Sequence, residues 1–161
     1  MAERSGVEIA DTRKTAPGLR ALDKYAVRIA GGTNHRAGLY DAVLIKDNHW
    51  RLAGGVAEAV RRARSASCAG RGGIEIEVST LDEVREALRA GAEALLLDNM
   101  DPATLEQAIG IARGRAFLEV SGGVGEGDIA RLLALRVNRI SMGSLTHSVG
   151  AADIALELLP A

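Results

Sequence analysis

Strand-like and helix-like segments alternate six times along this chain, and this alternation constrains its fold more than any other feature. Apolar or alternating runs typical of strands cover residues 7–11, 42–45, 74–78, 94–99, 116–120 and 139–142. Helix-like segments follow them, beginning near residues 17, 56, 80, 101, 129 and 151, the last spanning 151–159. Because strands joined through helices lie parallel with right-handed crossovers, the chain is predicted to form a parallel α/β sheet.

Acidic residues inside these strands favour a sheet that curves around a central site. Glu75, Glu77, Asp98 and Glu119 are too polar for strands covered by helices on both faces, but they suit strands that line a cavity. A complete eight-unit barrel needs about 250 residues, whereas this chain has 161. We therefore expect residues 1–161 to form a single domain, an open or incomplete parallel α/β barrel of about six β-α units.

Composition argues against two classes of partner. The net charge is −1 and aromatic residues make up 2% of the chain, so neither a basic surface nor a stacking platform points to nucleic acid. No apolar run approaches the roughly 18–20 residues of a membrane span, and the N-terminus lacks a signal-peptide core. We expect a cytoplasmic protein that binds neither nucleic acid nor membrane.

Basic residues follow the first two strands. The chain has only three lysines, Lys14, Lys24 and Lys46, beside 17 arginines, and Lys46 directly follows an apolar strand. Ligands bind at the carboxyl ends of parallel strands, so a positive pocket for a carboxylate is expected there. Its members would be Arg13, Lys14, Arg36 and Lys46, with His35 nearby. The alternative for Arg13 and Lys14 is that they are solvated loop charges.

Carboxylates follow the next two strands. Glu77 and Asp98 end consecutive strands, so their carboxylates can approach each other. One or two carboxylates together with substrate phosphates are the usual ligands of Mg²⁺. We expect these two residues to hold the metal, with Glu75 and Glu119 as supporting partners behind them. The alternative is a structural salt bridge to Lys46 or Arg13.

Glycine-rich turns follow the last two strands, at Ser121-Gly122-Gly123 and Gly143-Ser144. Glycines allow backbone amides to approach an anion, so these turns predict a phosphate site; each glycine could instead serve a plain turn. His49 and His147 have no assigned role, and His147 could equally cap a helix or pack. Without a Cys/His cluster, a zinc site is not expected, and nothing in the sequence near Cys68 would activate it for catalysis.

Seven segments that together span the chain resemble the quinolinate phosphoribosyltransferase family, that is, nicotinate-nucleotide pyrophosphorylase (carboxylating), of the type II phosphoribosyltransferase fold. They are D-T-R-K-T-A-P-G-L-R from Asp11, G-G-T-N-H-R-A-G-L-Y-D from Gly31, L-I-K-D-N-H from Leu44, I-E-V from Ile76, L-L-D-N-M from Leu96, L-E-V-S-G-G-V from Leu118 and S-M-G-S-L-T-H-S from Ser141. The resemblance implies a transferase of NAD biosynthesis. It would convert quinolinate and phosphoribosyl pyrophosphate to nicotinate mononucleotide, pyrophosphate and carbon dioxide with Mg²⁺.

The resemblance also implies a role for each matched position. Quinolinate would be held by Thr12, Arg13, Lys14, His35, Arg36 and Lys46. The ribose, pyrophosphate and metal would be surrounded by the catalytic residues Lys46, Glu77 and Asp98. The 5-phosphate would bind Ser121, Gly122 and Gly123 and the turn of Met142, Gly143 and Ser144.

Members of this family carry an N-terminal domain before the barrel, whereas this chain starts at the first barrel strand. In the family that domain covers the barrel mouth and, in a homodimer, lends an arginine to the neighbouring quinolinate site. This leaves open a fragment that binds ligand without turnover. A second alternative is a related pyrophosphorylase-like protein of molybdenum transport, which shares the T-R-K-T and H-R-x-G-L pattern, although the I-K-D-N-H segment suits the quinolinate enzyme better.

Overall fold

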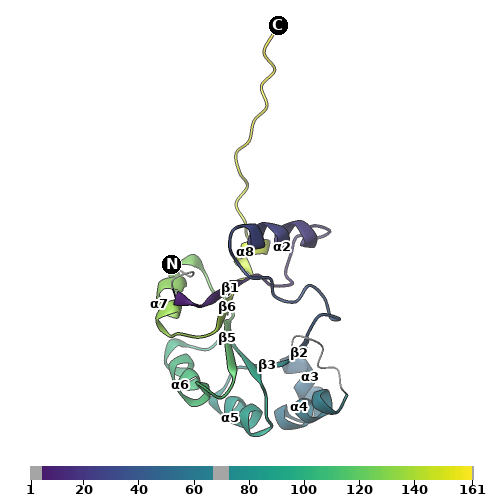
Figure 1. Cartoon of the computed structure of the whole chain (residues 1–161), viewed down its shortest axis with the longest axis vertical. Coiled ribbons are helices and arrows are strands. Elements are labelled where there is room, and N and C mark those ends of the chain that lie inside the picture. Colours follow the sequence, from purple (N-terminus) through teal and green to yellow (C-terminus); the bar gives the residue numbers. More distant parts are fainter. Residues whose placement is uncertain (1–4, 67–72, 161) are drawn as a thin grey trace.

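The computed structural model describes residues 5–66 and 73–160 and contains one parallel six-stranded sheet. The strands lie in the order β1-β6-β5-β4-β3-β2 across the sheet, so β2 to β6 are neighbours in chain order and β1 pairs with β6. The two edges of the sheet are therefore β1 and β2. Figure 1 shows the sheet curving around an interior, and the predicted parallel α/β architecture is confirmed. The strands are β1 (Glu8–Ala10), β2 (Val43–Ile45), β3 (Ile74–Val78), β4 (Ala94–Asp98), β5 (Phe117–Ser121) and β6 (Arg139–Ser141).

The sheet stays open because β1 does not pair with β2 in the part of the chain that the structure describes. A single parallel bridge between Ala10 and Thr33 occupies the free edge of β1 instead. The backbone there exchanges two hydrogen bonds, Thr33 N–H to Ile9 O at 2.8 Å and Asp11 N–H to Thr33 O at 3.1 Å. Residues 33–36 therefore lie along the seam between the two edge strands.

Helices follow the strands and cover the outer face of the sheet. Figure 1 shows α4, α5 and α6 as an arc around the strands, and α2 with α8 on the opposite side. Their starts are set by the sequence: Thr80 accepts a hydrogen bond from the Glu83 N–H before α5, and Asp101 accepts two at the start of α6. The helices are α2 (Arg20–Ile29), α3 (Asp47–Ala53), α4 (Val56–Ser65), α5 (Leu81–Arg89), α6 (Pro102–Ala112), α7 (Ile129–Ala134) and α8 (Ser144–His147), with a 3₁₀ turn η1 (Glu126–Asp128).

The pleat of the strands separates an aliphatic core from a polar interior. Successive side chains on a strand point to opposite faces, so on β4 the fully buried Leu95 and Leu97 pack in the core whereas Leu96 and Asp98 line the cavity described below. The register pairs Glu77 with Leu96 and Leu96 with Glu119, which places these side chains on the same inner face. The acidic residues therefore line the interior, as their positions in the strands predict.

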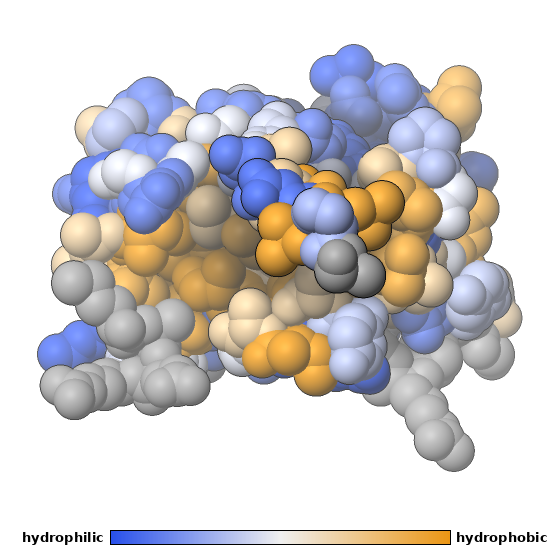
Figure 2. Space-filling model, turned by 90° about the horizontal axis from the view of Figure 1, so that it is seen from above, coloured by the Kyte–Doolittle hydropathy of each residue, from blue (hydrophilic) through white to orange (hydrophobic). Residues whose placement is uncertain are grey.

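The predicted helix at residues 151–159 is wrong, since residues 151–160 have no regular structure and extend away from the domain (Figure 1). An isolated helix of this length is marginal in water, and its apolar side chains find no surface to pack on. Ile154, Leu156, Leu158 and Leu159 are 84–89% exposed. Figure 2 looks onto the molecule from the end where this segment leaves it, and apolar side chains lie among polar ones on that face. On α2, Leu22, Tyr25 and Ile29 are 55–68% exposed.

The helix α3, directly after β2, was not expected, because Asp47–Ala53 lacks a clear apolar stripe. Cys68 lies outside the described residues. In the described ranges no helix combines the length and the apolar character needed to cross a bilayer.

Candidate active site

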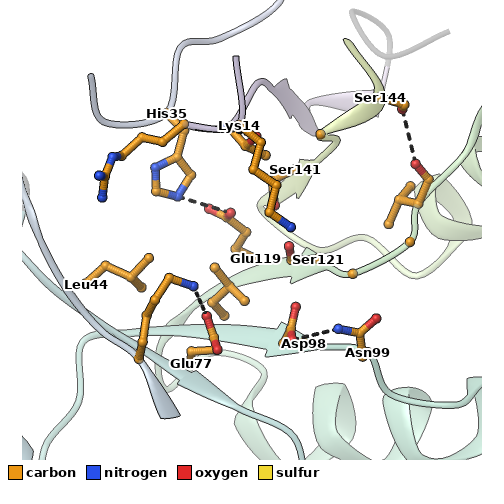
Figure 3. A pocket seen from close by; sticks show the side chains of 18 of the residues that line it. Lys14, His35, Leu44, Glu77, Asp98, Asn99, Glu119, Ser121, Ser141 and Ser144 are labelled. Carbon is orange, nitrogen blue, oxygen red and sulfur yellow. Dashed lines mark hydrogen bonds and ion pairs between the residues drawn. The ribbon is translucent and has the colours of Figure 1, made fainter. Parts of the chain in front are cut away.

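A cavity of about 550 Å³ lies at the carboxyl ends of the strands. It is lined by residues that directly follow β1, β2, β5 and β6, and by side chains from the inner face of β3, β4 and β5 (Figure 3). Every residue that the sequence predicts for the site lines this cavity except Met142, whose side chain is buried in the core. The predicted lining residues are Thr12, Arg13, Lys14, His35, Arg36, Lys46, Glu77, Asp98, Ser121, Gly122, Gly123, Gly143 and Ser144.

The cationic side of the cavity is built by the chain after β1, the segment at the seam and the end of β2. Arg36 donates from Nη1 to the Ala42 carbonyl at 3.1 Å, which ties the seam to the chain just before β2. Burial, together with the charge of Arg13, lowers the pKa of Arg36 from its ordinary value. Arg13 carries a buried Nε atom without a hydrogen-bond partner. Arg13 and Arg36 are therefore part of the cavity wall, whereas Lys14 lines the cavity but is exposed to solvent.

On the acidic side of the cavity, Glu77 makes the salt bridge to Lys46 that the sequence left open as the alternative to a metal site. The backbone carbonyl of Glu77 accepts a hydrogen bond from the Trp50 indole on α3 at 3.2 Å. Asp98 lies on the next strand and accepts from the Asn99 side chain at 2.8 Å (Figure 3). Two carboxylates at one cavity wall are a hard-oxygen donor set that fits Mg²⁺ held partly by substrate phosphates.

The glycine turns border the opposite part of the cavity. Gly122 has φ +94°, and a Cβ there would lie 2.5 Å from Cγ of Asn99 and 2.6 Å from its backbone nitrogen. A side chain at this position is therefore excluded by both backbone conformation and contact. Gly143 has an ordinary φ of −65°, but a Cβ there would lie 2.6 Å from Nε2 of His147, whose side chain itself lines the cavity. Ser144 fixes the two turns to each other through a 3.4 Å hydrogen bond to the Val124 carbonyl.

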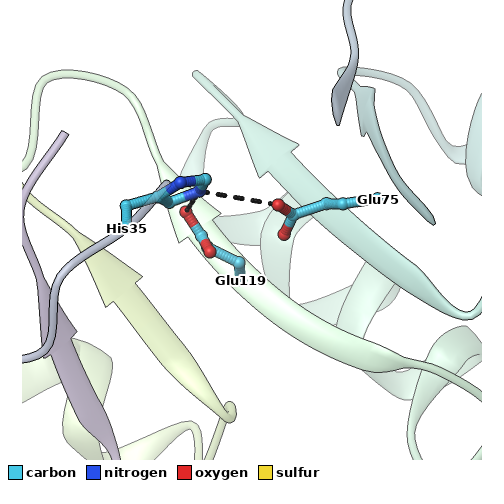
Figure 4. A group of neighbouring side chains, drawn as sticks. All are labelled: His35, Glu75 and Glu119. Atoms are coloured by element: carbon cyan, nitrogen blue, oxygen red, sulfur yellow. Dashed lines mark ion pairs between the residues drawn. The ribbon is translucent and has the colours of Figure 1, made fainter. Parts of the chain in front are cut away.

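A buried group of three side chains, His35, Glu75 and Glu119, lies in the barrel interior (Figure 4). Nε2 of His35 is 3.2 Å from Oε1 of Glu119 and 3.5 Å from Oε2 of Glu75. Their ligand atoms are close enough for a metal ion. However, Nδ1 of His35 accepts the Arg36 N–H at 2.8 Å, which leaves the ring proton on Nε2, facing the carboxylates. A metal-binding histidine shows the reverse pattern, donating from its outer nitrogen, so the orientation of His35 does not favour a metal ion here. Among the described residues, Oε1 of Glu119 has no hydrogen-bond partner of good geometry, so its contact with Nε2 of His35 is an ion pair at 3.2 Å.

The charges of this group shift one another's pKa values. Burial alone would lower the pKa of His35, but its contacts with Glu119 and then Glu75 raise it to about 9. Burial raises the pKa of Glu75. Burial would do the same for Glu119, yet the His35 ring and the charge of Arg139 hold the pKa of Glu119 below its ordinary value. Arg139 donates to Glu119 at 3.2 Å from the neighbouring strand β6.

Several residues of the site were not found by sequence reasoning. Asn99 has φ +52° and forms the wall behind Gly122, and Asp11 and Lys24 form a buried pair beneath the seam. The scarcity of lysine was a usable signal for Lys24. Of the two unassigned histidines, His147 lines the cavity, whereas Nδ1 of His49 accepts the Lys46 N–H at 3.0 Å and caps α3.

A parallel sheet that curves around a charged cavity at the carboxyl ends of its strands defines a barrel-type α/β protein with a cavity for a small molecule. Comparison with known families specifies the group. The profile of the family "Quinolinate phosphoribosyl transferase, C-terminal domain" matches residues 1–157, and the chain belongs to this family.

Individual relatives agree with this assignment. The chain is 43% identical over 152 residues to a probable nicotinate-nucleotide pyrophosphorylase (carboxylating) of Bacillus subtilis, covering 94% of this chain and 52% of the relative. It is 45% identical over 160 residues to the protein of that name in Methanocaldococcus jannaschii, covering 95% and 56%. The solved nicotinate-nucleotide pyrophosphorylase of Francisella tularensis superimposes with a TM-score of 0.83 at 43% identity, covering 90% of this chain and 51% of that one. The chain thus spans about half the length of these relatives.

Proposed function

We propose that this chain carries the catalytic cavity of a quinolinate phosphoribosyltransferase. The reaction joins the ring nitrogen of quinolinate to C1 of the ribose of phosphoribosyl pyrophosphate and releases pyrophosphate; loss of one carboxylate as carbon dioxide gives nicotinate mononucleotide. The observation that carries the proposal is the meeting of cations, carboxylates and glycine turns from six strands around one cavity. Relatives with the printed name nicotinate-nucleotide pyrophosphorylase support it.

The cationic side suits the pyridine dicarboxylate. Guanidinium groups grip carboxylates through two parallel hydrogen bonds, and a lysine adds a point charge. Arg13 and Arg36 would serve the first role and Lys14 the second, while the cationic surroundings favour the negative charge that builds up on the ring when carbon dioxide leaves. His35 has both ring nitrogens engaged, so a hydrogen bond from His35 to the substrate requires one of these contacts to break.

The acidic side suits the ribose and its leaving group. Departure of pyrophosphate leaves positive charge on the sugar, which the carboxylates of Glu77 and Asp98 would stabilise while Lys46 holds the departing oxygens. Bound Mg²⁺ would neutralise charge on the pyrophosphate. The Lys46–Glu77 ion pair keeps both side chains at the cavity before substrate arrives.

The glycine turns suit the 5-phosphate. Backbone amides that no side chain shields can approach an anion closely. The turn at Gly122 and Gly123 after β5 and the turn at Gly143 after β6 border the same cavity. Phosphate sites built from the loops after the last strands are common in barrel enzymes.

The proposal is tested by assaying nicotinate mononucleotide formation from quinolinate, phosphoribosyl pyrophosphate and Mg²⁺. Lys46→Ala is expected to abolish turnover. Arg51→Ala is the matched control, since Arg51 is a cation of α3 that pairs with Asp47 and has a side chain 63% exposed. Calorimetry with each substrate separates a catalytic chain from one that binds without turnover. Binding of neither substrate would reject the proposal.

A further inference from the structure

A buried ion pair lies under the seam between β1 and β2. The side chain of Asp11 has no solvent exposure, and Lys24 of α2 reaches it at 2.5 Å. The Asp11 carboxylate also accepts hydrogen bonds from the Asn34 side chain at 2.6 Å and from the His35 N–H at 2.9 Å. Lys24 makes a second contact, donating to the His35 carbonyl at 2.7 Å. The pair therefore holds the backbone of His35 at both its N–H and its carbonyl.

Hydrogen bonds of this ion pair continue along the edge of β1 past the last backbone–backbone pair. Thr33 pairs with the β1 edge through its own backbone, and His35, two residues on, is the next residue whose N–H faces that edge. Its partner is no longer a backbone carbonyl but the Asp11 side chain, with Asn34 bracing it through a 2.8 Å bond to the Lys24 carbonyl. The seam is thus closed at this level by side chains instead of by a neighbouring strand.

The segment held in this way carries two groups of the cationic pocket. From the fixed backbone of His35, the imidazole reaches across the interior to Glu119 of β5 and Glu75 of β3. Arg36, the next residue, lines the cavity and reaches the Ala42 carbonyl ahead of β2. Displacement of this backbone would move both side chains away from the ligand.

Stability alone is a weak reason for such a pair. Replacing a buried ion pair by apolar residues of similar volume is often neutral or stabilising, because desolvation of the charges offsets their attraction. The contacts of Asp11 and Lys24 converge on one residue of the cavity wall, which points to placement of that residue as their role.

We propose that Asp11 and Lys24 are positioning residues that set His35 and Arg36 in the dicarboxylate pocket. This rests on the proposed function for the identity of the ligand. It separates the pocket into two parts, because among the described residues none of the ion pairs and hydrogen bonds of the Asp11 and Lys24 side chains reaches the turns at Gly122 and Gly143. Loss of the pair should therefore weaken binding of quinolinate and spare binding of phosphoribosyl pyrophosphate.

The test compares Asp11→Asn, Asn34→Ala and the double variant Asp11→Leu/Lys24→Met with the wild-type chain. Asp11→Asn leaves the buried Lys24 without its counter-charge, which destabilises the folded chain. The double variant removes both charges and Asn34→Ala removes neither, so these two variants avoid a buried unpaired charge. Asp101→Asn, at the α6 N-cap, is the control carboxylate. Calorimetry gives Kd for quinolinate and, with Mg²⁺, for phosphoribosyl pyrophosphate. Imidazole ¹⁵N spectra, simple with three histidines in the chain, report the surroundings of His35.

For each folded variant we expect the quinolinate Kd to rise on the order of tenfold to a hundredfold, as a displaced binding group produces. The Kd for phosphoribosyl pyrophosphate should change by less than about threefold, and the His35 signals should shift. Equal weakening of both ligands, or unchanged His35 signals and quinolinate affinity, would overturn the proposal. If the wild-type chain binds neither ligand, the proposed function fails, and the His35 spectra alone then decide whether the pair positions the segment.

Discussion

Nε2 of His35 lies 3.2 Å from Oε1 of Glu119, a side chain without solvent exposure. Residues 35 and 119 come from the seam and from the middle of the sheet, so this contact spans the barrel interior. Oε2 of Glu119 is already held by Arg139, and Glu75 offers a second carboxylate to His35. The ring thus lies among one cation and two carboxylates, and their charges favour its protonated form.

Unfolding of the protein is therefore expected to become easier as the pH rises from about 6.5 to about 9. The folded pKa of His35 is raised from 6.5 to about 9 by its carboxylate neighbours against the effect of burial. Its stabilisation is complete below the unfolded pKa and is lost as the pH rises through the folded one. The raised pKa of Glu75 acts in the same direction. Denaturant titrations across this range measure the effect.

His35→Gln serves as the control, because it removes the titrating ring and should flatten this part of the pH profile. Glu119→Gln should lower the pKa of His35, measured from its imidazole NMR signals. The hydrogen bond from the Arg36 N–H requires an unprotonated Nδ1 on His35, so it acts on the His35 pKa in the direction opposite to the carboxylates. A wild-type His35 that titrates at or below 6.5 would show that this opposition prevails.

Gly122→Ala is expected to destabilise the chain and weaken its affinity for phosphoribosyl pyrophosphate. Strain at φ +94° costs on the order of 1–3 kcal/mol, and the new methyl group would displace Asn99. Gly110→Ala is the matched control, because Gly110 lies inside α6 with free space around it. This substitution should stabilise the chain by about 0.5–1 kcal/mol. Chemical denaturation measures the free energy of unfolding of both variants. Equal changes in the two would contradict the conclusion that a side chain at position 122 is excluded by strain and contact.

The fold was predictable from the sequence because its signals are local. Alternation of apolar runs, the Thr80 and Asp101 caps and the acidic residues inside strands each specify an element or its inner face. One exception was α3, which the sequence did not predict, and another was the C-terminal segment, residues 151–160. Its apolar spacing suits a helix, but a short helix forms only against a packing surface, which a spacing pattern does not report.

The cavity lining was predictable because parallel strands bring their carboxyl ends to one edge. The contacts that hold it were not predictable, since they join residues far apart in sequence through side chains that turn inward. Lys24 sits on an amphipathic helix where a lysine is expected to face water, yet it is 7% exposed. Its ammonium reaches the Asp11 carboxylate and the His35 carbonyl beside β1, and the open seam that these groups line forms only when the sheet is assembled.

Asp98→Asn is expected to remove the Mg²⁺ dependence of phosphoribosyl pyrophosphate binding while leaving quinolinate binding intact. The variant keeps the shape of the side chain and a carbonyl oxygen for the Asn99 contact, but it loses the negative charge that a hard cation requires. In the wild-type chain, chelation of Mg²⁺ should weaken phosphoribosyl pyrophosphate binding on the order of tenfold, and in the variant it should have little effect. Calorimetry with and without EDTA measures both. Unchanged Mg²⁺ dependence in Asp98→Asn would place the metal on other ligands, and a parallel loss of quinolinate affinity would indicate that Asp98 supports the whole cavity.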